Sequence, residues 1–287
     1  MRGYLVRRVA RAALALVLVV LITYLLFGVL PHTGAGSPGT YLKAIFVNSY
    51  RGRGSVPGLI VARLPATASL VIGALVMWVL VAIPVAIAAA VRRGTRIDRA
   101  VAGSMLTLGA APAFWLGLLG LYLFASNVGQ FPILPGAGSY VGLTADAGKW
   151  FTSLIMPWLA IALTQGAMAS VLLRRELTEL SARDYVVAAS AKGLPHRKVV
   201  WRHAARAAAA PTLKVLGIEL GALLGAAILV EAAFKINGVG LLVYQSIRHH
   251  DLVIVEGAVV LAGLFMVLVR LALDIIRALV DPRVRAT

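Results

Sequence analysis

Long uncharged runs, separated by charged or Gly/Pro-rich segments, are the dominant pattern of this chain. At ~1.5 Å per residue in a helix, six of these runs are long enough to cross a hydrocarbon layer of ~30 Å. They cover approximately Ala12–Leu30, Ala66–Val91, Val101–Ala125, Trp150–Leu173, Lys214–Ala233 and Val253–Ile276. The pattern predicts an all-α polytopic membrane protein with six transmembrane helices in a single domain over residues 1–287.

Composition supports this class and removes several others. The 287 residues are 60% hydrophobic and only 14% charged, whereas soluble domains carry about 25% charged residues. The chain has no cysteine, which excludes disulfides and thiolate metal sites. The first uncharged run has 19 residues, longer than a signal-peptide core of ~7–15 residues, and we expect it to be retained as a span.

The distribution of basic residues predicts the orientation. Twenty Lys and Arg residues lie at the two ends of the chain and in the second-to-third and fourth-to-fifth connections, against seven in the other connections. The positive-inside rule therefore places both termini in the cytoplasm. It also accounts for the net charge of +17 without nucleic acid as a partner. We expect a cytoplasmic loop at about 174–213 and outer loops at about 31–65, 126–149 and 234–252.

The large cytoplasmic loop contains a helical pattern. Ser181 and Asp184 are spaced as a capping box, which would start a helix that runs to Lys192. Gly193 can end that helix, and Pro195 suits the first turn of a second one. From spacing alone, two interpretations are equally favoured: a compact element that docks on another protein, and an amphipathic helix that lies on anionic lipid.

A resemblance to a known family changes this balance. The loop resembles the "EAA" loop in permeases of ABC importers of the dipeptide/oligopeptide/nickel family, and in particular the DppB/OppB type of subunit. Further motifs agree in order along nearly the whole chain. They are Arg63-Leu-Pro-Ala-Thr67, Pro112-Ala-Phe-Trp-Leu-Gly117, Ile155-Met-Pro157, Val230-Glu-Ala-Ala-Phe234 and Asp281-Pro-Arg-Val-Arg285. Two segments depart from the family pattern: the outer segment from Pro31 to Pro38 lacks its acidic turn, and Val187-Ala-Ala-Ser190 replaces an Arg-rich helix.

The resemblance implies a type I ABC-importer permease fold and a function. The chain would be the non-catalytic transmembrane subunit of an ATP-driven peptide importer in the cell membrane of a prokaryote, with nickel or another peptide-sized ligand as the alternative substrate. Its partners would be a second homologous permease, two ATPase subunits (or one fused ATPase) and an extracytoplasmic substrate-binding protein. ATP and Mg would bind to the ATPase subunits, since the chain has no Gly-x4-Gly-Lys-[Ser/Thr] motif. The implied docking residues, called the coupling set below, are Asp184, Tyr185, Ala188, Ala189, Lys192, Gly193 and Leu194.

Small and kinking residues within the predicted spans suggest how the helices pack. Gly217, Gly221 and Gly225 recur every four residues, and we expect this face to pack within the chain or against the partner permease. Pro84 and Pro112 should kink their spans. The kink at Pro112 could shape a gate beside two aromatic residues, Phe114 and Trp115, although packing is the plainer role for both.

Two charged residues lie well inside the predicted spans. Glu219 and Arg270 are each about six residues from the cytoplasmic end of a span, where a charge costs ~2.5–3.5 kcal/mol on insertion scales. Their equal depth predicts a Glu219–Arg270 ion pair, with Asp274 as the rival partner of Arg270.

Other functions have less support in the sequence. A secondary transporter would need carboxylates or broken helices near mid-membrane, and only Glu219 approaches that. No His-Glu-x-x-His or Gly-x-Ser-x-Gly motif is present, and no spacing of side chains predicts a metal site.

Overall fold

The computed structural model describes residues 2–29, 39, 43, 55–181 and 209–280. Within them the secondary structure is helical, apart from one isolated bridge between Ala125 and Leu134. The helices are α1 (Arg2–Thr23), the π-helical turn η1 (Tyr24–Val29), α3 (Val56–Val61), α4 (Leu64–Val91), α5 (Arg96–Ala110), α6 (Ala113–Phe124), α7 (Ala147–Ser181), α11 (Ala209–Phe234), α12 (Val239–Arg248) and α13 (Leu252–Val280). The predicted all-α class is confirmed.

Four of these helices are long and apolar enough to cross a membrane: α1, α4, α7 and α13. The number rises to six if each of two bent helix pairs is one span. The predicted six spans correspond to this upper number, and the predicted orientation of the termini stays a prediction.

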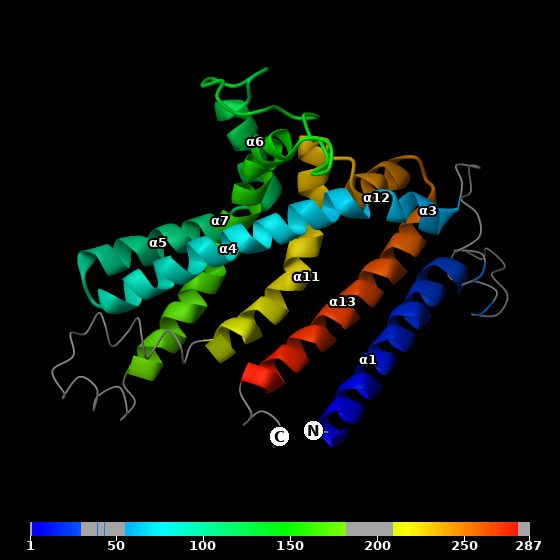
Figure 1. The fold of residues 1–287 in the computed structure, drawn as a ribbon, viewed down its shortest axis with the longest axis horizontal. Coiled ribbons are helices and arrows are strands. Elements are labelled where there is room, and N and C mark those ends of the chain that lie inside the picture. The colour runs from blue at the N-terminus through cyan, green and yellow to red at the C-terminus, as the bar shows by residue number, and fades with distance from the viewer. Residues whose placement is uncertain (1, 30–38, 40–42, 44–54, 182–208, 281–287) are drawn as a thin grey trace. The chain divides into compact units, whose positions relative to one another are not determined.

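Contacts divide the chain into two compact units. The first consists of Met1–Ala68 and Asn237–Thr287. In it α1 and α13 lie side by side (Figure 1), and they approach closely where Gly263 faces Val19. A Cβ atom added to Gly263 would lie 2.7 Å from Cγ1 of Val19. The apolar core of this unit joins α3, α12 and α13 through Val56, Ile60, Leu242, Ile254 and Ala258.

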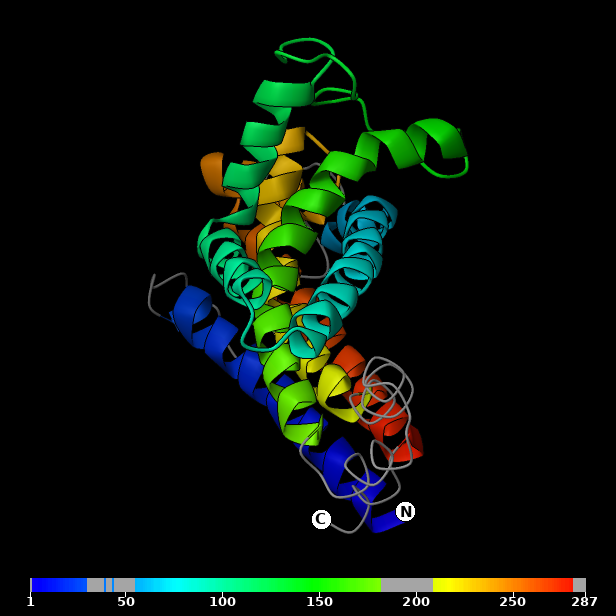
Figure 2. The same ribbon diagram turned by 90° about the vertical axis from the view of Figure 1, so that its left-hand side faces the viewer.

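The second unit, Ser69–Ile236, is organised around α7. This helix runs as one continuous element of 35 residues past Pro157 in its interior (Figure 2). One core cluster joins α4, α7 and α11 through Trp78, Ala82, Ala162, Ala169 and Val215. Trp158, also on α7, contacts α4: its indole Nε1 donates to the carbonyl of Ser69 at 3.0 Å. Small and aromatic side chains thus allow the helices of this unit to pack closely.

A sharp bend separates α5 from α6. The two helix axes meet at 98°, and Pro112 stands at the N-cap of α6 with an extended ψ of 139°. Proline has no N–H to donate, and its ring clashes with the carbonyl four residues back, here Leu108. The predicted kink at Pro112 is therefore present, as a break between two helices. By contrast, α4 continues as one helix past Pro84.

Candidate functional site

The coupling loop predicted at about 174–213 overlaps the end of α7, whose last residue is Ser181. A helix of 35 residues is about 52 Å long at ~1.5 Å per residue, well beyond a hydrocarbon layer of ~30 Å. The surplus at its C-terminal end includes the polar turns from Arg174 to Ser181. Residues 182–208, which contain the whole coupling set, lie outside the described residues. The packing of Arg174–Ser181, called the loop base below, is therefore the described structure that positions this loop.

Next to the loop base, the turn between α4 and α5 is closed by its own hydrogen bonds. Oγ1 of Thr95 accepts from the backbone N–H of Asp98 at 3.2 Å and donates to the carbonyl of Arg92 at 2.7 Å. Gly94 adopts a left-handed φ of 79°, which glycine accommodates without a Cβ clash. Its N–H donates to Oδ2 of Asp98 at 2.9 Å. The turn thus presents the Asp98 carboxylate in the first turn of α5, where the helix dipole favours a negative charge.

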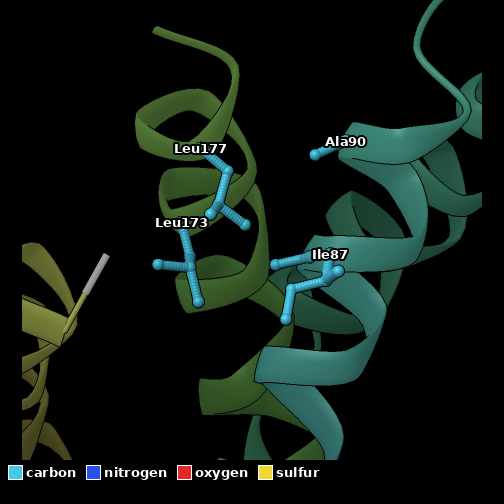
Figure 3. Close-up of a cluster of buried hydrophobic side chains, with 5 residues drawn as sticks. Ile87, Ala90, Leu173 and Leu177 are labelled. Atoms are coloured by element: carbon cyan, nitrogen blue, oxygen red, sulfur yellow. The ribbon is translucent and has the colours of Figure 1, made fainter. Parts of the chain in front are cut away.

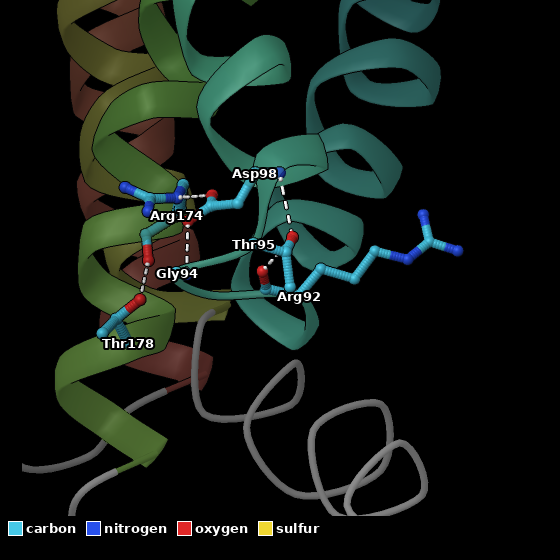
Figure 4. Close-up of polar contacts among 6 residues, drawn as sticks. All are labelled: Arg92, Gly94, Thr95, Asp98, Arg174 and Thr178. Atoms are coloured by element: carbon cyan, nitrogen blue, oxygen red, sulfur yellow. Dashed lines mark hydrogen bonds and ion pairs between the residues drawn. The ribbon is translucent and has the colours of Figure 1, made fainter.

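The carboxylate of Asp98 binds the guanidinium of Arg174 on α7 through two hydrogen bonds. Nε of Arg174 donates to Oδ1 and Nη2 donates to Oδ2, each at 2.7 Å (Figure 4). The Asp98 side chain is only 3% exposed, and that of Arg174 is 29% exposed. A fork of this kind fixes both the distance and the orientation of the two helices. The pair joins residues 76 positions apart.

An apolar cluster fixes the same end of α7 to α4. It contains Ala86, Ile87 and Ala90 of α4 and Leu173 and Leu177 of α7 (Figure 3). Leu177 is completely buried. The loop base is therefore held on one side by apolar packing and on another by an ion pair.

A second ion pair of the loop base differs in kind. Arg175 donates to Glu179 at 3.0 Å, four residues along the same helix, and the two side chains are 79% and 62% exposed. Exposed pairs of this type contribute about 0–1 kcal/mol. This pair links no second helix.

Asp98 and Thr95 are not among the site residues predicted from the sequence, and Arg174 entered the prediction only as one of the basic residues that indicate the topology. A signal for the first two was present, because Thr95-x-x-Asp98 has the spacing of a capping box. The pairing with Arg174 had no local signal.

The charged residues predicted to pair within the membrane are placed as follows. Glu219 is buried on α11, and Arg270 is exposed on α13. They belong to different units, so their pairing stays a prediction. Asp274, the expected rival partner of Arg270, accepts a hydrogen bond from Nη1 of Arg8 at 2.6 Å. The sequence analysis had not considered Arg8 as a partner.

The predicted packing glycines lie on α11. Gly217 and Gly221 are partly buried and Gly225 is exposed. A Cβ atom added to Gly225 would meet nothing within 4 Å. The described structure therefore leaves room at Gly225, and the packing role of the three glycines stays a prediction.

The remaining predicted residues lie at the start of α6. Phe114 is partly buried and Trp115 is 51% exposed, beside the break at Pro112. A role in gating stays a prediction. Within the part of the chain that the structure describes, no group of three or more His, Asp or Glu side chains could hold a metal ion.

Comparison with known proteins identifies the family. Residues 82–286 match the family described as "Binding-protein-dependent transport system inner membrane component". A peptide transport system permease protein of Brucella abortus (strain 2308) is 33% identical over 226 residues, which cover 79% of this chain and 71% of the relative. The dipeptide transport system permease protein DppB of Escherichia coli K12 is 30% identical over 244 residues, covering 78% and 72%. This chain therefore belongs to the family of binding-protein-dependent transport system inner membrane components.

Proposed function

We propose that this chain is the permease subunit of an ATP-driven importer and forms half of the translocation pathway for short peptides. The observation that carries the proposal is the family match over residues 82–286, which includes α7, the loop base and the predicted coupling loop. The named relatives transport peptides or dipeptides according to their names, which supports peptides as the substrate class. The chain itself would carry out no bond chemistry.

The loop at 182–208 would dock on a separate ATPase subunit through the coupling set. Two features of the described residues support this role. The loop continues directly from α7, a single helix long enough to reach beyond the hydrocarbon layer. The loop base is fixed to both α4 and α5. A loop on such a support can transmit a displacement instead of absorbing it.

The complete importer would contain a second homologous permease, two ATPase subunits that bind ATP and Mg, and an extracytoplasmic substrate-binding protein. The open space at Gly225 on α11 supports close contact with the second permease, because small residues let helix backbones approach each other in membranes.

Reconstitution of the complete importer tests this function. The permease would be co-expressed with an ATPase, a second permease and a binding protein from the same organism, and the purified complex placed in proteoliposomes. With ATP and Mg on the ATPase side and the binding protein on the other, we expect ATP-dependent accumulation of radiolabelled dialanine. No ATPase subunit in the purified complex, or uptake driven by a proton gradient without ATP, would overturn the proposal. Uptake of nickel but not of dialanine would overturn the substrate class alone.

A further inference from the structure

We propose that the Asp98–Arg174 ion pair is the positioning element that carries displacement of the coupling loop to the bend between α5 and α6. The proposal rests on the proposed function, because it assumes that the loop at 182–208 is moved by an ATPase. It assigns to Asp98 and Arg174 a role in coupling rather than in contact with substrate or nucleotide.

The pair lies on a short path from the loop to the bend. Arg174 stands seven residues before Ser181, the last residue of α7, which is about 10 Å at ~1.5 Å per residue. Asp98 lies in the first turn of α5, and that helix ends at Ala110, directly before the break at Pro112. A displacement of the loop base is thus passed to one end of α5, and the other end of α5 is the 98° bend.

The form of the contact suits this transmission better than it suits stability. The Asp98 side chain is 3% exposed and that of Arg174 is 29% exposed, so desolvation offsets part of their attraction, and apolar residues can stabilise such a contact comparably. Apolar side chains, however, can shift past one another. Two hydrogen bonds of 2.7 Å between a fork and a carboxylate allow only one register. The third bond, from Gly94 to Asp98, ties the same carboxylate to its own turn.

The structure also supplies a matched control. Arg175 is the next residue on α7 and has the same side chain, and among the described residues its ion pair is with Glu179 of its own helix on an exposed surface. Loss of its charge changes the local electrostatics in a similar way but breaks no link between helices.

The test compares variants in the complete importer in proteoliposomes. The measured quantity is the number of dialanine molecules accumulated per ATP hydrolysed. We expect Arg174→Gln to lower this ratio about tenfold, within the ~5–150-fold range of typical coupling effects, while the ATPase subunits still co-purify. Arg175→Gln should leave the ratio unchanged. Arg174→Lys should give an intermediate ratio, because an ammonium keeps the charge without the planar fork.

A double variant separates coupling from folding. Arg174→Gln alone leaves a buried carboxylate without its cation, which can destabilise the chain. In Asp98→Asn/Arg174→Met the amide oxygen can still accept from Gly94 and no buried charge is left, so the thermal stability should return close to that of the wild type. The ratio of transport to hydrolysis should stay low, because the fork is absent.

Recovery of the ratio together with stability would show that the pair serves folding only, and would overturn the inference. So would a ratio for Arg174→Gln equal to that for Arg175→Gln. The wild-type sample tests the proposed function by itself. If it contained no ATPase subunit or showed no ATP-dependent uptake, the proposed function would fail, independently of the role of the ion pair.

Discussion

Replacement of Gly73 by alanine should destabilise the second unit, because α4 and α7 meet at this residue without room for a methyl group. A Cβ atom at position 73 would overlap with Cε2, Nε1 and Cζ2 of Trp158. Trp158 is 3% exposed, and it cannot move without loss of contacts. Its indole donates to Ser69, and its ring packs edge-to-face on Trp150 and Phe151 at centroid distances of 5.2 and 5.5 Å.

The magnitude follows from these contacts. Loss of the indole hydrogen bond costs ~0.5–1.5 kcal/mol, and each aromatic pair is worth ~0.5–1.5 kcal/mol. Overpacking of a core typically costs ~1–3 kcal/mol, and partial retention of the contacts keeps the total within that range. Alanine is favoured over glycine in a helix by ~1 kcal/mol, which offsets part of the loss. We expect a net decrease in the free energy of unfolding of about 1 kcal/mol.

Unfolding by sodium dodecyl sulfate in mixed detergent micelles, followed by tryptophan fluorescence, measures this difference. The matched control is Gly103→Ala on α5, where an added Cβ meets nothing within 4 Å. The control should be as stable as the wild type or more stable by up to ~1 kcal/mol. Equal free energies of unfolding for Gly73→Ala and Gly103→Ala would refute the close approach of α4 and α7 at Trp158.

Three further predictions concern assembly, coupling and the first unit. Gly225→Leu should lower recovery of the second permease in affinity purification about tenfold, equivalent to ~1.4 kcal/mol of association free energy. The stability of the chain itself should not decrease, since an added Cβ at Gly225 meets nothing within 4 Å, and undiminished recovery would contradict a packing role. Gly193→Trp should leave ATP hydrolysis intact and abolish dialanine uptake in proteoliposomes. Unchanged uptake would argue against docking through the coupling set. Arg8→Gln removes the 2.6 Å contact with Asp274, whose side chain is 16% exposed, and should lower the free energy of unfolding by ~1.5–3 kcal/mol. The control is Arg11→Gln, because within the described ranges the Arg11 guanidinium reaches only a backbone carbonyl, at 3.4 Å. Equal stability of the two variants would count against the ion pair.

Much of the helical framework could be predicted from uncharged runs alone. The predicted spans Ala66–Val91 and Trp150–Leu173 lie within α4 and α7, because apolar length is a direct requirement of the bilayer. The pattern did not predict how sharply a helix changes direction within one uncharged run. Val101–Ala125 is uniformly apolar enough to be one span, yet its two helices meet at 98°. Pro112 signalled a kink, but the angle depends on packing between helices that are distant in sequence.

The candidate site was predicted only in part. The location of the coupling loop came from a resemblance to known permeases and from the charge pattern, and its residues lie outside the described ranges. The turn at Thr95 and Asp98 has a local signature that the sequence analysis overlooked. The bond from Asp98 to Arg174 has none, because a contact across 76 positions is created by the packing of α5 on α7. The coupling loop thus stays a prediction from the sequence, whereas the structure shows how the loop base is packed.

The break at Pro112 also limits what can surround the two helix ends. With 15 and 12 residues, α5 and α6 are about 22 and 18 Å long at ~1.5 Å per residue, so that neither arm alone traverses the lipid. A helix end leaves carbonyl oxygens without intrahelical donors, and hydrocarbon chains offer none. Such an interruption is tolerated at depth only where protein covers it or water reaches it. As part of one span, the bend at Pro112 must therefore lie against protein or water rather than lipid. One of the carbonyls at the end of α5, that of Leu108, accepts from the N–H of Ala111 at 3.2 Å.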